Sequence, residues 1–482
     1  MSLFKSPDLW HSSRLEDLFS HIIGGDWGKS PECDESGYEL VACIRGSEFK
    51  NWLSDNGKTA VQRKVKISSL EKRSLVPGDI LLEISGGGPE QPVGRTVLIS
   101  QSVIDQFSEK VVGTNFLRLM RPSEYMDPRF IKYFLDVFYL SGEIVNYQGG
   151  SNNLRNLKFK DFSQVDVPVA TLSEQKIIVE KLDTLLGQVE ATKARLERIP
   201  QILKRFRQSV LAAAVSGKLT EEWRGDSQYS SIFGIHCAPQ TWEVSNLGDK
   251  VEYVTSGSRG WAKYYSVSGA LFVRSQDINT DKIEIESAAY VSLPDSIEGR
   301  RTRLEIDDIL LTITGANVTK CARVVEDLGE AYISQHVALI RLKETEQSLF
   351  VEIALKALNA GRKQLTDMAY GGGKPGLNLQ NIKDVILAFP SLEEQTEIVR
   401  RVDQLFAYAD TIEKQVNAAL ERVNHLTQSI LAKAFRGELT AQWREENPEL
   451  ISGENSAEAL LERIKAERAA QAPKKRGRKS AI

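Results

Sequence analysis

The fold is decided by a stretch of sequence that occurs twice. The first copy, residues 172–224, reads LSEQKIIVEKLDTLLGQVEATKARLERIPQILKRFRQSVLAAAVSGKLTEEWR. The second copy, residues 392–444, reads LEEQTEIVRRVDQLFAYADTIEKQVNAALERVNHLTQSILAKAFRGELTAQWR and aligns with the first without a gap. Matching residues occur along the whole length, from Glu174 and Glu394 to Arg224 and Arg444. A repeat this regular indicates one structural unit that has been duplicated.

Apolar residues in both copies recur every three or four positions, which is the spacing of coiled-coil helices. Such a narrow stripe needs a partner helix, and the other copy is the obvious one. The alternative is a pair of ordinary amphipathic helices in a larger bundle, but the matched length and constant offset favour a paired coiled coil. The predicted helix-pairing residues are Ile178, Leu182, Leu185, Val189, Leu196, Ile199, Leu203, Phe206, Val210, Ile398, Val402, Leu405, Ile412, Val416, Val423, Leu426 and Ile430.

Three residues mark irregular points in these helices. Pro200 lies inside the first copy, where it removes a backbone hydrogen bond and is expected to bend the helix. Gly217 and Gly437 follow the last apolar repeats and suit the C-terminal caps of helices.

Composition excludes several classes of protein. The net charge of −3 rules out a uniformly basic nucleic-acid binder, so any DNA contact must be local. The four cysteines show no paired spacing, which argues against zinc and disulfides and fits a cytoplasmic location. The N-terminus lacks an apolar signal core, and no apolar run is long enough to cross a membrane.

The globular segment before the first helix copy shows a weaker sequence similarity to the globular segment before the second copy. Trp10 and Leu15 return as Trp242 and Leu247, and the run from Asp79 to Leu82 returns from Asp308 to Leu311. The short apolar runs 80–82 and 97–99 predict strands, and residues 130–139 predict a helix entered past Asp127 and Pro128. Outside these anchors the two segments differ. A common scaffold that carries two different readers is expected to have this pattern.

The predicted layout is therefore globular, helix, globular, helix. The segments are a globular domain (1–170), a central helix (171–224), a linker (225–239), a second globular domain (240–390), a distal helix (391–444), and a short helix with a basic, disordered tail (445–482). The tail, 473–479, suits non-specific phosphate or minor-groove contact, although a merely solvated tail is the simpler interpretation.

Searches for catalytic motifs fail. Gly28–Ser30 and Gly57–Thr59 resemble the end of a phosphate-binding loop, but neither has the earlier glycine that such a loop requires. The five histidines are scattered and suggest no metal site, and the glycine runs at 86–88 and 371–373 are better explained as tight turns than as nucleotide sites.

Loop residues of the globular segments offer the chemistry of DNA recognition. Arginine and lysine read guanine edges, asparagine and glutamine read adenine, and small groups approach phosphates. Each residue alone has a simpler explanation as a solvated loop side chain, and Trp261 is equally well explained as a core aromatic. The DNA-binding candidates are Arg45, Ser47, Lys50, Asn51, Arg95, Asn152, Asn153, Arg155, Ser258, Arg259, Lys263, Arg274, Gln276, Asn317, Lys320, Gln335, His336 and Lys374.

The repeated stretch carries a resemblance to a known family. The runs from Glu174 to Leu186, from Ile199 to Gln208 and from Val215 to Arg224 resemble the DNA-specificity subunit of type I restriction-modification systems, in its enterobacterial branch. The resemblance extends over nearly the whole chain and includes Pro200, which is thus a feature of the family.

The resemblance implies a fold and a function. The fold is α+β, with two mixed α/β target-recognition domains separated by two long antiparallel coiled-coil helices in a pseudo-twofold repeat. Each domain reads one half of a split site on double-stranded DNA, and the helices set the spacer and dock two modification (methyltransferase) subunits. Those subunits bind S-adenosylmethionine and methylate adenine, and ATP-dependent restriction subunits cleave unmodified DNA. The specificity subunit itself has no catalytic site, cofactor or metal, and no membrane contact is expected.

Two other interpretations compete with this one. A catalytic restriction-modification polypeptide is disfavoured because no cofactor or nuclease motif is found. A coiled-coil assembly protein without a DNA-reading role is disfavoured because it needs no pair of diverged globular domains.

Overall fold

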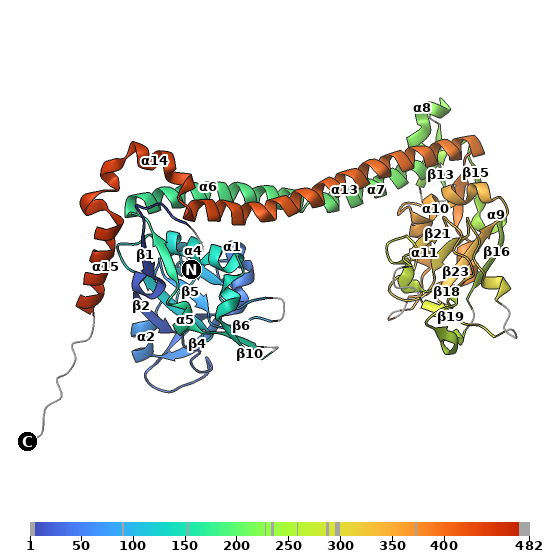
Figure 1. Cartoon of the computed structure of the whole chain (residues 1–482). Coiled ribbons are helices and arrows are strands. Elements are labelled where there is room, and N and C mark those ends of the chain that lie inside the picture. The colour runs from blue at the N-terminus through green and yellow to red at the C-terminus, as the bar shows by residue number, and fades with distance from the viewer. Residues whose placement is uncertain are drawn as a thin grey trace, which may run out of the picture. The chain divides into compact units, whose positions relative to one another are not determined.

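A computed structural model describes residues 5–88, 91–151, 154–226, 228–232, 236–257, 259–285, 289–294, 299–371, 373 and 375–471. The chain forms two compact units. Unit 1 comprises residues 1–196 and 419–482, and unit 2 comprises residues 197–418. Each unit combines one globular domain with part of both helix copies (Figure 1). The basic tail, 473–479, lies outside the described residues.

The first helix copy is divided in two where the sequence predicted a bend. Helix α6 (Leu172–Leu196) ends four residues before Pro200, and α7 (Ile199–Val215) begins with this proline in its first turn. The proline ring would clash with the carbonyl of Leu196, four residues earlier, so a regular, straight helix is interrupted at this point. The prediction of one long central helix is corrected accordingly. The second copy has Leu420 at the matching position and forms one helix of 44 residues, α13 (Leu392–Phe435).

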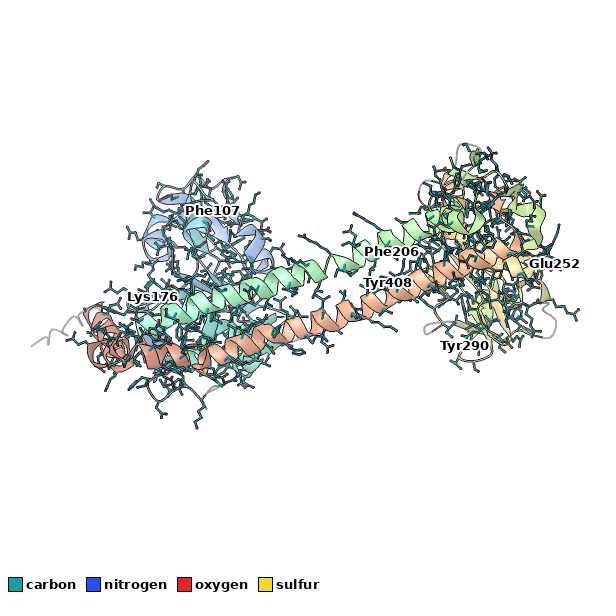
Figure 2. All side chains as sticks on the ribbon, turned by 90° about the horizontal axis from the view of Figure 1, so that it is seen from above. Phe107, Lys176, Phe206, Glu252, Tyr290 and Tyr408 are labelled. Carbon is teal, nitrogen blue, oxygen red and sulfur yellow. The ribbon has the colours of Figure 1, made fainter. Side chains whose placement is uncertain are left out.

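The two copies run antiparallel within each unit. In unit 2 the contacts move in opposite directions along the two copies: Arg207 pairs with Asp410 and Glu413, and Arg401 donates to the carbonyl of Leu219. In unit 1 the start of α6 meets the residues that follow α13. Figure 2 shows α7 and α13 side by side, with Phe206 on the first and Tyr408 on the second.

Burial of the predicted pairing residues follows the heptad pattern. The most buried residues of the set are Ile178, Leu182, Val189, Leu203, Val210, Ile398, Val402, Val416 and Val423. The others are partly buried, except Leu426, whose side chain is 46% exposed. The caps agree with the sequence: Gly217 and Gly437 have φ of 71° and 70°, which favours glycine just past a helix end.

Unit 1 contains two main sheets. The first has strand order β2-β9-β5-β7 and is antiparallel, and the second, β4-β3-β8, includes a parallel pair of β3 and β8. Smaller ladders are formed by β1-β12 and β10-β11-β6. The strands are β1 (His11–Arg14), β2 (Phe19–Gly24), β3 (Tyr38–Ile44), β4 (Val61–Lys66), β5 (Ile80–Glu83), β6 (Ser85–Gly86), β7 (Thr96–Leu98), β8 (Lys110–Gly113), β9 (Leu117–Pro122), β10 (Gln148–Ser151), β11 (Leu154–Leu157) and β12 (Asp166–Val169).

Helices cover these sheets and form the core of unit 1. The predicted helix at 130–139 is α4 (Pro128–Leu140), capped by Asp127, whose side chain accepts from the backbone N–H of Arg129. Its Phe130 and Phe134 pack against Phe435 at the end of α13. The other helices of unit 1 are α1 (Trp52–Asp55), α2 (Ile67–Arg73), α3 (Gln101–Ile104), α5 (Phe159–Phe162), α14 (Ala441–Glu446) and α15 (Ala457–Gln471).

Unit 2 repeats the plan of unit 1. Its antiparallel sheet has strand order β16-β23-β20-β21, and its second sheet, β17-β19-β18-β22, includes a parallel pair of β18 and β22. The strands are β13 (Tyr229–Ile232), β14 (His236–Pro239), β15 (Glu243–Asn246), β16 (Val251–Ser256), β17 (Tyr265–Ser266), β18 (Ala270–Val273), β19 (Ala289–Val291), β20 (Ile309–Thr312), β21 (Cys321–Arg323), β22 (Ala331–Ile333), β23 (Val337–Leu342) and β24 (Ile386–Phe389).

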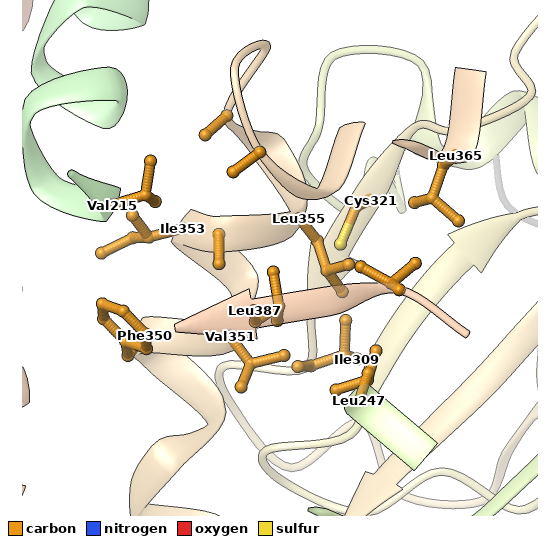
Figure 3. Close-up of a cluster of buried hydrophobic side chains, with 14 of the residues drawn as sticks. Val215, Leu247, Ile309, Cys321, Phe350, Val351, Ile353, Leu355, Leu365 and Leu387 are labelled. Carbon is orange, nitrogen blue, oxygen red and sulfur yellow. The ribbon is translucent and has the colours of Figure 1, made fainter. Parts of the chain in front are cut away.

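The core of unit 2 joins the helix copies to the sheet. Figure 3 shows Phe350 and Val351 of α10 among buried side chains that include Val215 of α7 and Leu387 of β24. Trp261, which the sequence left undecided, is a core aromatic stacked on Phe272. The helices are α8 (Glu221–Arg224), α9 (Leu247–Lys250), α10 (Ser348–Lys356), α11 (Gly361–Met368) and α12 (Leu379–Lys383).

One ion pair shows how closely the two globular domains correspond. Asp79, just before β5, pairs with Arg121 of β9, with 2.7 Å between the nearest atoms. Asp308, just before β20, pairs with Arg341 of β23 at 2.6 Å. Both carboxylates are buried, so the pair fixes the same strand register in each unit. The faint sequence echo around Asp79 and Asp308 thus reflects a shared sheet.

Candidate nucleic-acid interface

Each globular domain brings its candidate loops together at one edge. In unit 1 the parallel strands β3 and β8 end side by side, so the loops after Ile44 and after Gly113 are neighbours. The chain after β5 joins them, because the N–H of Ile84 donates to the carbonyl of Phe116 at 2.9 Å. The recognition edge of unit 1 is therefore built from three loops, of which the structure describes residues 45–51, 84–88 with 91–95, and 114–116.

Two arginines hold this edge in place. Arg45 begins the turn that follows β3, and its guanidinium donates to Glu48 at 2.6 Å. Arg95 donates to Glu83 at 2.7 Å and to the carbonyl of Gly46 at 2.9 Å, which ties two of the loops together. Both glutamates are buried, and their hydrogen bonds raise the pKa of each arginine. These guanidinium groups thus have structural partners within the domain.

A hollow of about 720 Å³ opens at this edge. It combines basic, amide and aromatic groups, and its lining includes the Arg95–Glu83 pair. Such a mixture suits contact with base edges and phosphates, since both need donors in a partly desolvated setting. The lining residues are Trp27, Arg45, Gly46, Ser47, Lys50, Glu83, Ser85, Gly86, Gln91, Arg95, Thr114, Asn115 and Phe116.

Unit 2 builds the same edge with different side chains. Arg274 begins the turn after β18, and its guanidinium donates to Asp277 at 2.9 Å, which raises the pKa of this arginine. Asn317 takes the place of Arg95: its side chain donates to the carbonyl of Ser275 at 3.1 Å. The loops after β18, β20 and β22 therefore meet as those of unit 1 do, and they bring Arg274, Gln276, Asn317, Gln335 and His336 to one edge.

The other candidates are distributed as follows. Ser47 donates to Glu48 at 3.2 Å, Lys50 and Asn51 are exposed, and Arg155 lies on β11 opposite Gly86. In unit 2 Arg259 and Lys263 are exposed, with Lys263 above the Tyr264 ring, and Lys320 lies 3.8 Å from Asp281. Asn152, Asn153, Ser258 and Lys374 lie outside the described residues. Their DNA contacts stay predictions.

Several lining residues were missed by the sequence reasoning, and Trp27, Asn115 and Phe116 are among them. Asn115 and Phe116 form the tip of the turn after β8, and Trp27 lies beside it with Arg63 stacked 4.3 Å from its ring. A signal for two of them was available. Aligning the domains from Asp79 and Asp308 through Arg121 and Arg341 places Asn115–Phe116 on Gln335–His336, which the sequence did select.

A second repeated site lies where the helix copies meet the globular domains. In unit 2 Glu394 accepts hydrogen bonds from Thr220 at 2.7 Å, Arg224 at 2.7 Å and the indole of Trp242 at 3.0 Å. We call this cluster the unit 2 lock. Its counterpart, the unit 1 lock, joins Glu174 to Trp10, Thr440 and Arg444. Each lock takes its glutamate from one copy and its threonine and arginine from the other.

Two absences concern the described ranges. No group of three or more metal-binding side chains is found among the residues that the structure describes. Over the same part of the chain, no helix has the length and apolarity needed to cross a bilayer.

Two duplicated globular domains with equivalent, diverged loop edges define a two-module recognition scaffold. Comparison with known proteins identifies the class. The family model for the type I restriction modification DNA specificity domain matches residues 7–201 and 239–422. The StySPI specificity subunit of Salmonella potsdam is 38% identical over 100% of both chains, and the EcoKI specificity subunit of Escherichia coli K12 is 36% identical over 99% of this chain and 100% of the relative.

Solved structures agree on the fold. A chain from a study of type I R-M assembly and conformational transition has a TM-score of 0.66 at 15% identity and covers 90% of this chain and 100% of its own. The HsdS subunit of Thermoanaerobacter tengcongensis has a TM-score of 0.54 at 17% identity, with 90% and 99% covered. The chain belongs to the family of type I restriction-modification specificity subunits. The resemblance seen in the repeated stretch, the fold class and the assignment to a non-catalytic subunit are thereby confirmed.

Proposed function

We propose that unit 1 and unit 2 each read one half of a bipartite DNA site for a type I restriction-modification complex. The observation that carries this proposal is the pair of recognition edges. Both edges have a parallel strand pair, an arginine paired with a carboxylate at the start of the turn, and a side chain that ties two loops together. The side chain that ties the loops differs between them: it is Arg95 in unit 1 and Asn317 in unit 2. Two readers of different sequences on one scaffold require this combination, whereas an assembly protein without a DNA-reading role does not.

The locks support the expected partners. A site repeated in both copies offers equivalent docking positions for two modification subunits, and Trp223, which is 47% exposed, flanks the unit 2 lock as Trp443 flanks the other. Restriction subunits join the complex to cleave unmodified DNA in the cytoplasm. S-adenosylmethionine binds to the modification subunits. Dialysis with labelled cofactor should therefore detect binding by those subunits and none by this chain.

The test is co-expression with the modification subunit of the same system, followed by sequencing that detects methylated adenines. The expected result is a single split motif, methylated on both strands. A matched variant with the domain 1–170 exchanged for that of a relative should change one half of the motif only. A stable complex that methylates no split motif would refute the recognition role, and the absence of any complex would favour the assembly-protein interpretation.

A further inference from the structure

We propose that two equivalent turn tips, Asn115–Phe116 in unit 1 and Gln335–His336 in unit 2, make the base-specific contacts in the two half-sites. The inference rests on the proposed function and deepens it. It assigns adenine recognition to the amides of Asn115 and Gln335, while the arginines behind them hold the turns in position.

The two turns have the same backbone. In unit 1 the N–H of Leu117 donates to the carbonyl of Thr114 at 2.9 Å, and the N–H of Thr114 donates to that of Ile44 at 2.9 Å. In unit 2 Val337 donates to Ser334 at 3.0 Å, and Ser334 donates to Val273 at 2.9 Å. Each turn thus closes on itself and is anchored to the end of the neighbouring parallel strand.

A glycine in each domain packs closely against the base of the turn. A Cβ on Gly25 would lie 2.2 Å from the carbonyl oxygens of Gly113 and Thr114, and one on Gly257 would lie 2.0 Å from that of Ile333. The incoming chain therefore passes directly against the base of each turn. The two residues at the tip of each turn are exposed.

The tip side chains are available, whereas the candidate arginines around them are engaged. Asn115 is exposed and has no side-chain hydrogen bond within the described part of the chain. The side chain of Gln335 is also exposed, and among the described residues it hydrogen-bonds only to the adjacent His336. Arg45 and Arg95 are paired with buried carboxylates. A reader needs free donors and acceptors, so the amides at the tips fit that role better than the guanidinium groups.

The residues next to the amides fit the same role. Phe116 is 51% exposed at a position where the fold gains nothing from a large apolar ring. An aromatic ring beside an amide suits contact with a thymine methyl group next to an adenine. The side-chain amide of asparagine or glutamine can donate its N–H to N7 of adenine and accept from the N6 amino group with its oxygen. Loss of such a bidentate pair changes base discrimination roughly 5- to 150-fold.

The experiment uses the full chain in complex with the modification subunits. Asn115→Ala and Gln335→Ala are assayed for methyl transfer on duplexes that vary one base pair at a time across both half-sites. Asn115→Ala should lower discrimination roughly 5- to 150-fold at one adenine-containing base pair of one half-site and leave the other half unchanged. Gln335→Ala should do the reverse.

The matched control is Gln101→Ala. Gln101 is an exposed amide that follows β7, and β7 runs antiparallel to β5, so Gln101 lies at the sheet end opposite the recognition edge. This variant should keep full discrimination. Relaxed discrimination at a single base pair is a result that misfolding cannot produce. If both tip variants keep wild-type discrimination at every position, the inference is wrong. If the wild-type complex methylates no split motif, the proposed function itself fails.

Discussion

Removal of the central carboxylate of the unit 2 lock should loosen the junction between the helix copies and the globular domain. In Glu394→Ala the guanidinium of Arg224 and the indole of Trp242 lose their common acceptor. The Arg224 and Glu394 side chains are 7% and 5% exposed, so the pair is buried. Deleting one partner of a buried pair costs about 3–5 kcal/mol, because the remaining charge is left desolvated and unpaired.

Hydrogen–deuterium exchange on the full chain can measure this loss locally, which is preferable because two units need not unfold as one. A cost of about 3–5 kcal/mol corresponds to exchange faster by roughly two to three orders of magnitude or more in peptides covering 216–224. Glu174→Ala should produce the same effect in unit 1 peptides covering 436–444.

The control lies further along the same helix. Arg400 is 52% exposed and pairs with Glu397 three residues earlier on α13, so Arg400→Ala should leave exchange in 216–224 unchanged. Equal exchange in Glu394→Ala and Arg400→Ala would show that the lock contributes no stability and refute the reasoning.

Three further predictions concern a cap, the thiols and acid stability. Gly217→Ala should lower the unfolding midpoint of unit 2, because the new Cβ would lie 2.4 Å from Cγ of Pro239. Gly187→Ala, where a Cβ would meet open space in α6, should instead stabilise unit 1 by about 0.5–1 kcal/mol. Calorimetry that finds equal effects for the two variants would contradict this difference. Burial raises the pKa of Cys43 and of Cys321 to about 12, so iodoacetamide at neutral pH should label Cys33 and Cys237 in the native chain and all four cysteines only after denaturation. Burial opposes ionisation of Asp281, but hydrogen bonds and charge from Arg362 hold its pKa below the ordinary value. The stability that this carboxylate contributes is therefore present above about pH 4 and lost on further acidification. Asp281→Asn should flatten the acid limb of unfolding followed by fluorescence, and an unchanged acid limb would count against the Asp281–Arg362 pair.

The helical part of the fold could be predicted from the sequence because the patterns that indicate it involve neighbouring residues. The apolar spacing around Ile178 and Ile398, the glycines at 217 and 437 and the helix at Asp127–Pro128 each depend on neighbouring residues. Pro200 predicted a bend, but the chain breaks there instead. The reason is that two successive residues, Glu197 and Arg198, leave the helix before the proline starts a new one.

The locks could not be predicted from the sequence, although each of their residues recurs in the other half of the chain. Glu174, Thr220 and Arg224 recur as Glu394, Thr440 and Arg444, which suggests that the three act together within one copy. The structure joins Glu174 to Thr440 and Arg444 instead. A repeated sequence shows which residues share a role, but it cannot show which copy supplies each partner.

The same limit explains why the recognition edge was predicted only in outline. Arginine is suited both to guanine edges and to buried carboxylates, so Arg45 and Arg274 fit either role until Glu48 and Asp277 are seen beside them. Asn115 does not have these two competing roles, but it belongs to no local sequence motif that would have singled it out. Its importance follows only from its position at the tip of a turn that the paired strands and their arginines hold at the edge. In a protein whose reading residues must vary while its scaffold stays constant, the scaffold residues give the stronger sequence signal, and the readers are found by asking what that scaffold presents.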